Sequence, residues 1–361
     1  MSIPGKLKRR KSTQPKQEKE SNQIGQIKKE DFNGRGTVQL TTHQLAQFLS
    51  FENRGRNQFS PLPTDIKSES PGQDFLEMMA SYGWITSSGQ ASEPVLSSLA
   101  EQVLISLSSP QTRVQLILGS PTELASTQLF SASGFQDEQL TIYTFREAED
   151  LHVIRPQVSP SDLSDALLAN LLLGPHKGGF SFELQLSDDL LVGYLTILDL
   201  LYSRRLEAKL DGELYPELNF TDKDLEKRFT AIRMGEDLLW MSALVPYLFP
   251  NLNPQLYNGK TSVLLEKITS QALLTPVKKG VFQPSDFTLA LSEAIVPIIN
   301  FASVGIVDQK YSGLYLAFFI GSNANVVLKF SASDDGNMAE ITGMDGIQLS
   351  RLLYEIGLPE K

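Results

Sequence analysis

The stretch "TVQLTTHQLAQFL" (37–49) decides the fold, because "FELQLSDDLLVGYL" (182–195) repeats its pattern later in the chain. Each stretch predicts a short strand, then a hydroxyl residue suited to cap a helix, then a helix with apolar residues on one face. When the two are superimposed without a gap, Thr41 falls on Ser187. The chain therefore begins the same structural plan twice.

The similarity continues beyond these openings. "FLEMMASYGWIT" (75–86) matches "LLEKITSQALLT" (264–275), with four of the twelve positions identical. In each copy a second helix follows near a proline, then three strand candidates, and finally a short strand with a last helix. The second helices are predicted over 92–110 and 283–301, the strands over 113–119, 126–135, 139–145, 303–309, 313–321 and 325–333, and the closing segments over 151–175 and 339–359. A repeated order of elements sets the architecture more firmly than any local motif.

This order predicts an α+β fold with an internal, quasi-two-fold duplication. Strands joined by short turns favour antiparallel meanders, which would form a central sheet with the helices packed on one side. We expect a disordered basic tail over 1–34, a first α+β repeat over 35–175 and a second over 176–361, with an insertion at about 207–260. The two repeats are expected to form one globular unit.

The charge is unevenly distributed along the 361 residues. The formal net charge is −10, but residues 1–20 carry seven Lys or Arg against two Glu, a net charge of +5 that leaves −15 on the rest. An acidic body argues against a broad nucleic-acid surface. The tail over 1–20 is either a contact for an anionic surface or a solubilising segment.

Cysteine is absent, which excludes disulfides, thiolate nucleophiles and cysteine-bound zinc and fits a cytoplasmic protein. The longest apolar run, Leu190 to Tyr202, is interrupted by Asp199 and is shorter than the roughly 20 residues that span a bilayer. We therefore predict no transmembrane segment.

One motif suggests nucleotide chemistry. "NGKTS" (258–262) ends like a phosphate-binding loop, with Lys260 in the place of the phosphate-binding lysine. Pro254 stands where the first glycine should be, and a proline has no N–H to offer a phosphate. A nucleotide-binding enzyme that uses Lys260 is thus the least favoured function. The favoured interpretation is that Thr261 or Ser262 caps a helix equivalent to the one near 75.

No other catalytic pattern is present. His43, His152 and His176 are isolated and lack the spacing of a metal site or a catalytic triad, so each is expected to be solvated or hydrogen-bonded. We predict a protein that is not an enzyme, with no cofactor, no metal and no catalytic residue.

The candidate partner-binding residues are Tyr315 and Phe319 in "GLYLAFFIG" (313–321). Alternation along this strand places both on one face, opposite Leu316 and Phe318. If helices cover only the other face, the two aromatic rings are exposed and offer a docking patch. If a second layer covers them, they belong to the core.

The chain resembles the EspG-type chaperones of type VII (ESX) secretion systems over about residues 36–358. The resemblance rests on "VQLTTHQLAQFL", on the proline-containing loop "FSPLPTDI", on "FLEMMASYGWITSSGQASEPVLSSLAEQVL" and on the series that ends in "VIRPQVSPSDLSDALLANLL". It implies a quasi-two-fold α+β fold whose halves share a central sheet, and binding of PE–PPE-type substrates in the cytosol. This chain differs in its greater length, its basic tail and its Lys/Gln/Ser-rich composition.

Two hypotheses from different classes follow. The first is a cytoplasmic, non-enzymatic chaperone or adaptor that binds a helical secretion substrate before export by a type VII-like system. The second is a structural or adaptor subunit of a larger assembly, tethered by the basic tail.

Overall fold

The computed structural model describes residues 37–51, 55–62, 66–67, 69–86, 94–120, 122–132, 140–146, 149–171, 181–213, 217–233, 240–249, 260–295, 298–308, 311–321, 324–333 and 336–357. The predicted tail over 1–34 lies outside these ranges, and so do Asn258 and Gly259 of "NGKTS". The limits of the two repeats remain predictions.

The elements of the first half run from β1 to α4. They are β1 (Val38–Leu40), α1 (Thr42–Ser50), α2 (Gln73–Ser81), β2 (Ile85–Thr86), β3 (Val95–Leu96), α3 (Ser98–Ser108), β4 (Thr112–Ser120), β5 (Glu123–Ser131), β6 (Leu140–Arg146), β7 (Leu151–Val158) and α4 (Pro160–Leu171). Of the two threonines predicted as the cap, Thr41 and Thr42, Thr41 caps α1, where it forms a capping box with Gln44.

The second half follows the same order with additions. Its elements are β8 (Phe182–Ser187), α5 (Asp188–Leu210), β9 (Phe220–Thr221), α6 (Asp222–Arg233), α7 (Met241–Leu248), α8 (Thr261–Ser270), β10 (Leu274–Lys278), β11 (Val281–Pro284), α9 (Asp286–Ile295), β12 (Ile298–Asp308), β13 (Tyr311–Gly321), β14 (Asn325–Ser333), β15 (Gly336–Met344) and α10 (Gly346–Gly357). The elements β9, α6 and α7 have no counterpart among the described residues of the first half.

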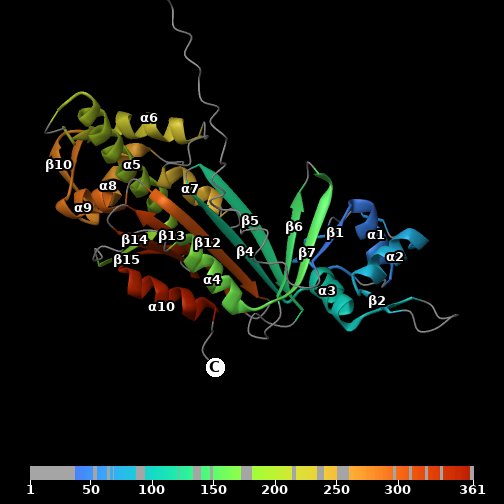
Figure 1. Cartoon of the computed structure of the whole chain (residues 1–361). Helices are drawn as coiled ribbons and strands as arrows, with labels where there is room; N and C mark the ends of the chain where they lie inside the picture. The colour runs from blue at the N-terminus through green and yellow to red at the C-terminus, as the bar shows by residue number, and fades with distance from the viewer. Residues whose placement is uncertain are drawn as a thin grey trace, which may run out of the picture.

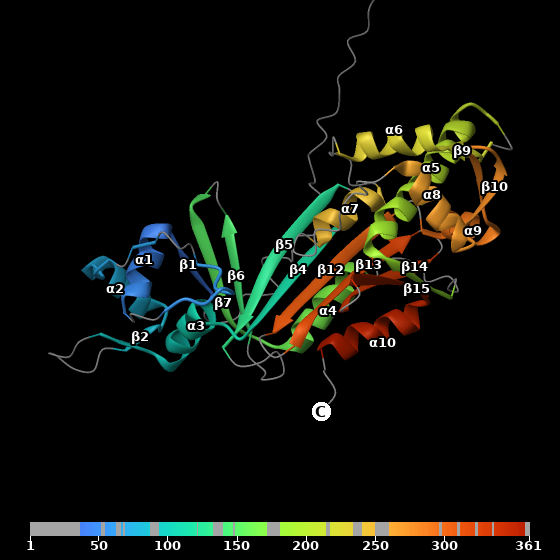
Figure 2. The same cartoon turned by 180° about the vertical axis from the view of Figure 1, so that it is seen from behind.

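A ten-stranded antiparallel sheet runs through the whole molecule (Figures 1 and 2), so the predicted α+β fold class is confirmed. Its order is β1-β7-β6-β5-β4 followed by β12-β13-β14-β15-β8, five strands from each half. The halves meet where β4 pairs with β12, with Ile117 opposite Ser303. In each half the first strand lies beside the last one, which is the arrangement that a quasi-two-fold duplication requires.

Most helices lie on one face of this sheet, as the sequence predicted. Helices α1, α2 and α3 cover that face at one end of the sheet, and α5, α7, α8 and α9 cover it at the other end. The exceptions are α4 and α10, the closing helices of the two halves, which pack together on the opposite face (Figure 1). Ser164 of α4 donates a hydrogen bond of 2.9 Å to the carbonyl of Leu353 in α10.

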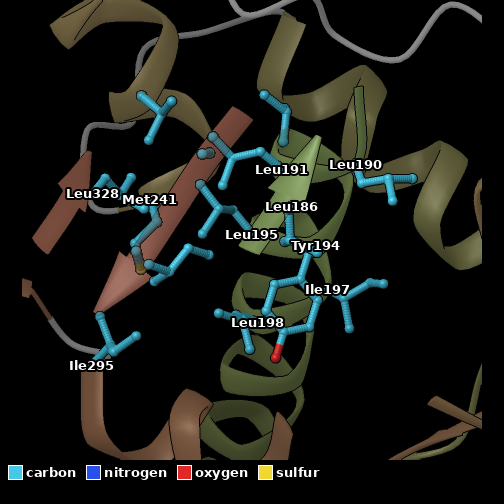
Figure 3. Close-up of a cluster of buried hydrophobic side chains, with 14 of the residues drawn as sticks. Leu186, Leu190, Leu191, Tyr194, Leu195, Ile197, Leu198, Met241, Ile295 and Leu328 are labelled. Carbon is cyan, nitrogen blue, oxygen red and sulfur yellow. The ribbon is translucent and has the colours of Figure 1, made fainter. Parts of the chain in front are cut away.

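The largest core surrounds α5. From Leu190 to Leu201 this helix is apolar around nearly its whole circumference, which is typical of a helix segment buried on all sides. Figure 3 shows Leu191 and Leu195 beside Met241 of α7 and Leu328 of β14, and all four are buried. The hydroxyl of Tyr194 lies 3.1 Å from Thr288 Oγ1 of α9, so the polar end of this buried ring has a partner.

Close backbone contact requires a glycine at the end of β13. A Cβ atom on Gly321 would overlap the carbonyl oxygen of Ile295 and lie 2.7 Å from that of Ala294. We expect Gly321→Ala to lower the free energy of unfolding by about 2–3 kcal/mol, because backbone atoms cannot move aside as a side chain can. Urea unfolding of the purified protein measures this change.

The matched control is Gly55→Ala, because a Cβ atom on Gly55 meets nothing within 4 Å. We expect this variant to stay within about 0.5 kcal/mol of the wild type. Equal stabilities of the two variants would contradict the packing found at Gly321.

The structure differs from the prediction in three places. The predicted helix over 283–301 ends at Ile295, and β12 already begins at Ile298. The sequence contains Pro297 at this point, and a proline disfavours helical geometry in the residue before it. The helix predictions also missed the two small hairpins β2–β3 and β10–β11.

Candidate functional site

Among the described residues, the helical layer on the main face of the sheet is interrupted at its middle. One row of paired residues crosses the sheet there, in the order Tyr143, Gln128, Gln115, Gly305, Tyr315 and Phe330. The two ends of this row are buried, Tyr143 at 5% exposure and Phe330 at 3%. The four residues between them are half-buried. The central strands thus present a partly open surface between two buried regions.

We call this surface the window. It consists of Arg113 and Gln115 of β4, Gln128 of β5, Gly305 and Val307 of β12, and Tyr315 of β13, all half-buried. Figures 1 and 2 show the two groups of helices on either side of the central strands.

Neighbouring aromatic contacts mark the two borders of the window. On one side, the ring of Phe130 meets Tyr143 edge-on at 6.4 Å beneath α3. On the other side, Phe249, which directly follows α7, lies 4.6 Å from Phe330. Ser303 Oγ also donates to the carbonyl of Leu248 at the end of α7, over 3.4 Å. Helix α7 therefore forms the border next to Tyr315.

The ring of Tyr315 lies along the sheet surface. A Cβ atom on Gly305 would lie 3.1 Å from Tyr315 Cδ1, and one on Gly313 would lie 2.7 Å from Tyr315 Cε2. Only glycine at both positions leaves room for the ring, which packs over the backbone in the place of two missing side chains. One aromatic face is thereby held against the sheet.

The two predicted partner-binding residues differ in burial. Phe319 is fully buried beneath the helices of the second half, in the same cluster as Phe301 and Val326. Of the two alternatives that the sequence left open, the core position therefore holds for Phe319, because α7 and its neighbours form the covering second layer. Tyr315 is half-buried and lies in the window. Its role in partner binding remains a prediction.

The polar side chains of the window have no partner within the described part of the chain. This holds for Arg113, Gln115, Gln128 and Tyr315, whose side chains make no hydrogen bond or ion pair there. They carry several donors and acceptors that are only partly accessible to water. The alternation of polar and apolar residues that identifies the polar side chains of β4 can be read in the sequence, but the gap between the two groups of helices cannot.

Comparisons with known proteins establish no family. No family model matches the sequence, and no curated protein matches it significantly. Among solved structures, the chain is similar to the Mycobacterium tuberculosis type VII secretion system chaperone EspG5, solved in complex with a PE25–PPE41 dimer. The similarity covers 89% of this chain and 95% of that chain, with 9% sequence identity and a TM-score of 0.42.

The surroundings of Lys260 do not form a phosphate-binding loop in the described residues. Lys260 is the N-cap of α8, and the preceding described element is α7, a helix where a phosphate-binding loop follows a strand. The predicted side-chain cap is also wrong. Thr261 is the first helical residue, and its hydroxyl donates to Glu226 Oε1 over 3.2 Å.

Two of the three histidines lie within the described ranges. His43 pairs on the surface with Glu69, at 2.7 Å. His152 is fully buried, and its Nδ1 lies 2.9 Å from the hydroxyl of Tyr143. His176 lies outside the described residues.

A chain of hydrogen bonds runs from Asp150 through Thr42 and His152 to Tyr143. The hydroxyl of Thr42 donates to Asp150, so its oxygen can accept from His152 Nε2 at 3.0 Å. Nδ1 is then free to accept from Tyr143. Burial lowers the pKa of His152, and the nearby Asp150 only partly opposes this. A buried neutral histidine with both nitrogens satisfied serves the stability of the first half.

A second buried polar group anchors α7. Asp199 of α5 is fully buried and accepts hydrogen bonds from the backbone N–H groups of Met241 and Ser242, at 3.2 and 2.9 Å, and from the Ser242 hydroxyl. Burial raises the pKa of Asp199 to about 6, while the bonds from Ser242 and the charge of Arg228 act in the opposite direction. Asp199 thus caps the helix that borders the window.

Two further absences concern the described residues alone. Within them, no group of three or more acidic or histidine side chains is placed to hold a metal ion. No helix among them combines the length and apolar character needed to cross a membrane.

Proposed function

We propose that this protein is a cytoplasmic, non-enzymatic chaperone or adaptor that binds a helical secretion substrate at the window before export by a type VII-like system. One observation carries the proposal. Four polar side chains, none of which has a partner among the described residues, lie in a gap between two helical layers. Such a surface offers hydrogen bonds and an aromatic ring to a partner, and it contains no nucleophile or general base.

The position of the window favours a helix as the bound element. The strands β5, β4, β12 and β13 are paired on both sides, so their backbone groups cannot accept an added strand. At ~4.8 Å between neighbours, four strands span ~14 Å, which accommodates a helix ~10 Å wide. A partner helix in this place would continue the layer formed by α3 and α7.

The chemistry of the window suits the tip of such a helix. The ring of Tyr315 and the side chain of Val307 can cover apolar groups, and the two glutamines can bond to the exposed backbone groups of a helix end. By covering an apolar tip, the protein would keep a secretion substrate from aggregating. The sequence resemblance to EspG-type chaperones points to PE–PPE-type proteins as the first substrates to test.

We expect Tyr315→Ala to weaken binding of the substrate at least about 30-fold, because aromatic residues at the centre of an interface commonly contribute about 2 kcal/mol or more. The experiment co-expresses the full chain with PE–PPE-type pairs from its own genome. Complex formation is measured by size-exclusion chromatography, and affinity by calorimetry.

The control variant is Tyr354→Ala, which removes a half-exposed tyrosine of α10 on the opposite face. We expect it to bind as the wild type does. A complex that survives Tyr315→Ala unchanged would exclude the window, and the absence of any complex would refute the chaperone proposal. Deleting residues 1–34 tests the tethered-adaptor alternative, in which recruitment to an assembly is lost while substrate binding persists.

A further inference from the structure

The window contains one charged side chain, that of Arg113. Of its other members, two are glutamines, one is a tyrosine and two carry no polar side chain, so no side chain of the window itself is acidic. Within the described residues, the guanidinium makes neither a hydrogen bond nor an ion pair. The guanidinium of an arginine in this position carries five N–H donors and a positive charge. A bound partner can accept these hydrogen bonds and supply the negative charge.

We propose that the bound helix presents a carboxylate to Arg113, so that the substrate is recognised by an acidic residue at its tip. This inference rests on the proposed function and names the chemistry of its partner. A guanidinium and a carboxylate fit each other as a bidentate pair, which fixes orientation as well as supplying energy. The amides of Gln115 and Gln128 can donate to the same carboxylate.

The pairing of β4 with β5 and β12 fixes the position of Arg113 on the sheet. Arg113 lies opposite Phe130 of β5 on one side and Val307 of β12 on the other. Phe130 is fully buried in the core of the first half. The arginine therefore emerges from a rigid strand at the border of an apolar cluster, where partial exclusion of water strengthens an ion pair.

Charge also excludes two other occupants. The basic tail, with a net charge of +5 over residues 1–20, would be repelled by Arg113 and finds no acidic group in the window. A nucleic acid needs several clustered cations for its phosphates, and the window has one. An acidic helix is the occupant whose charge is complementary.

The test uses the PE–PPE-type complex obtained with the wild-type chain. We expect Arg113→Glu to weaken binding at least about 30-fold, as is usual when one member of a buried charge pair is lost. Arg113→Lys should retain part of the affinity, and a lysine in place of the substrate's acidic tip residue should restore binding to Arg113→Glu. Arg351→Glu on α10 is the control, since Arg351 is exposed on the opposite face.

The possible outcomes are distinct. The inference would be supported if Arg113→Glu loses substrate binding and the substrate with the reversed charge at its tip restores it. The thermal unfolding of the variant must match that of the wild type. Normal binding by Arg113→Glu alongside loss with Tyr315→Ala would overturn acidic recognition and leave the window intact. Normal binding by both variants would overturn the window itself, and failure of every substrate to bind the wild type would overturn both proposals.

Discussion

Replacing Phe319 by alanine is expected to lower the free energy of unfolding by about 3–5 kcal/mol. The Phe319 ring is fully buried between Phe301 of β12 and Val326 of β14, beneath the helices of the second half. Its removal leaves a cavity that paired strands cannot close. Urea unfolding followed by circular dichroism measures the loss.

Tyr315→Ala provides the comparison on the same strand face. Because this ring is half-exposed, we expect its removal to cost less than about 2 kcal/mol. The two variants should thus separate stability from partner binding, with Phe319 contributing to the first and Tyr315 to the second. Similar stability losses in both would mean that Tyr315 is as deeply buried as its neighbour.

The second large effect concerns pH. The pKa of Asp199 rises from its ordinary value of 3.8 to about 6 in the folded protein. A raised carboxyl pKa means that the folded state binds the proton more tightly, so this contribution to stability is present at low pH and is lost as the pH rises through 6. Between pH 4 and pH 8 the loss amounts to about 2 kcal/mol.

Asp199→Asn isolates this contribution. The asparagine cannot ionise, and its oxygen can still accept hydrogen bonds from the start of α7. Relative to the variant, the wild type should lose about 2 kcal/mol between pH 4 and pH 8, as measured by urea unfolding at several pH values. Asp211→Asn, a change at an exposed position, should follow the wild type. If the free energy of unfolding depended on pH in the same way for the wild type and Asp199→Asn, the raised pKa of Asp199 would be contradicted.

Internal repetition made the fold predictable. The alternation of apolar residues in 113–119 and 313–321 identified β4 and β13, and the match of 37–49 to 182–195 identified the two openings. The hairpin β10–β11 was missed because most residues of β10 are exposed, so its sequence lacks the alternation of apolar and polar residues that predicts a strand. The pairing of β4 with β12 joins residues far apart in the chain and has no local signal.

The site was only partly predictable for a similar reason. Alternation placed Tyr315 and Phe319 on one face, which the register confirms. Whether a helix covers either ring depends on α7, which belongs to the insertion and has no counterpart in the first half. The importance of Arg113 depends on Gln115 of the same strand and on Gln128 of the neighbouring β5, and only the folded sheet brings Gln128 beside the other two.

The pairing of β4 with β12 also affects the order in which the protein can be made. Each half can close on itself, since β1 pairs with β7 and β8 with β15. While the ribosome adds the 177 residues between Ser120 and Ile298, however, the edge of β4 has no neighbour. At about 5–20 residues per second this lasts roughly 10–35 s. During that time an apolar strand edge is open to pairing with other chains.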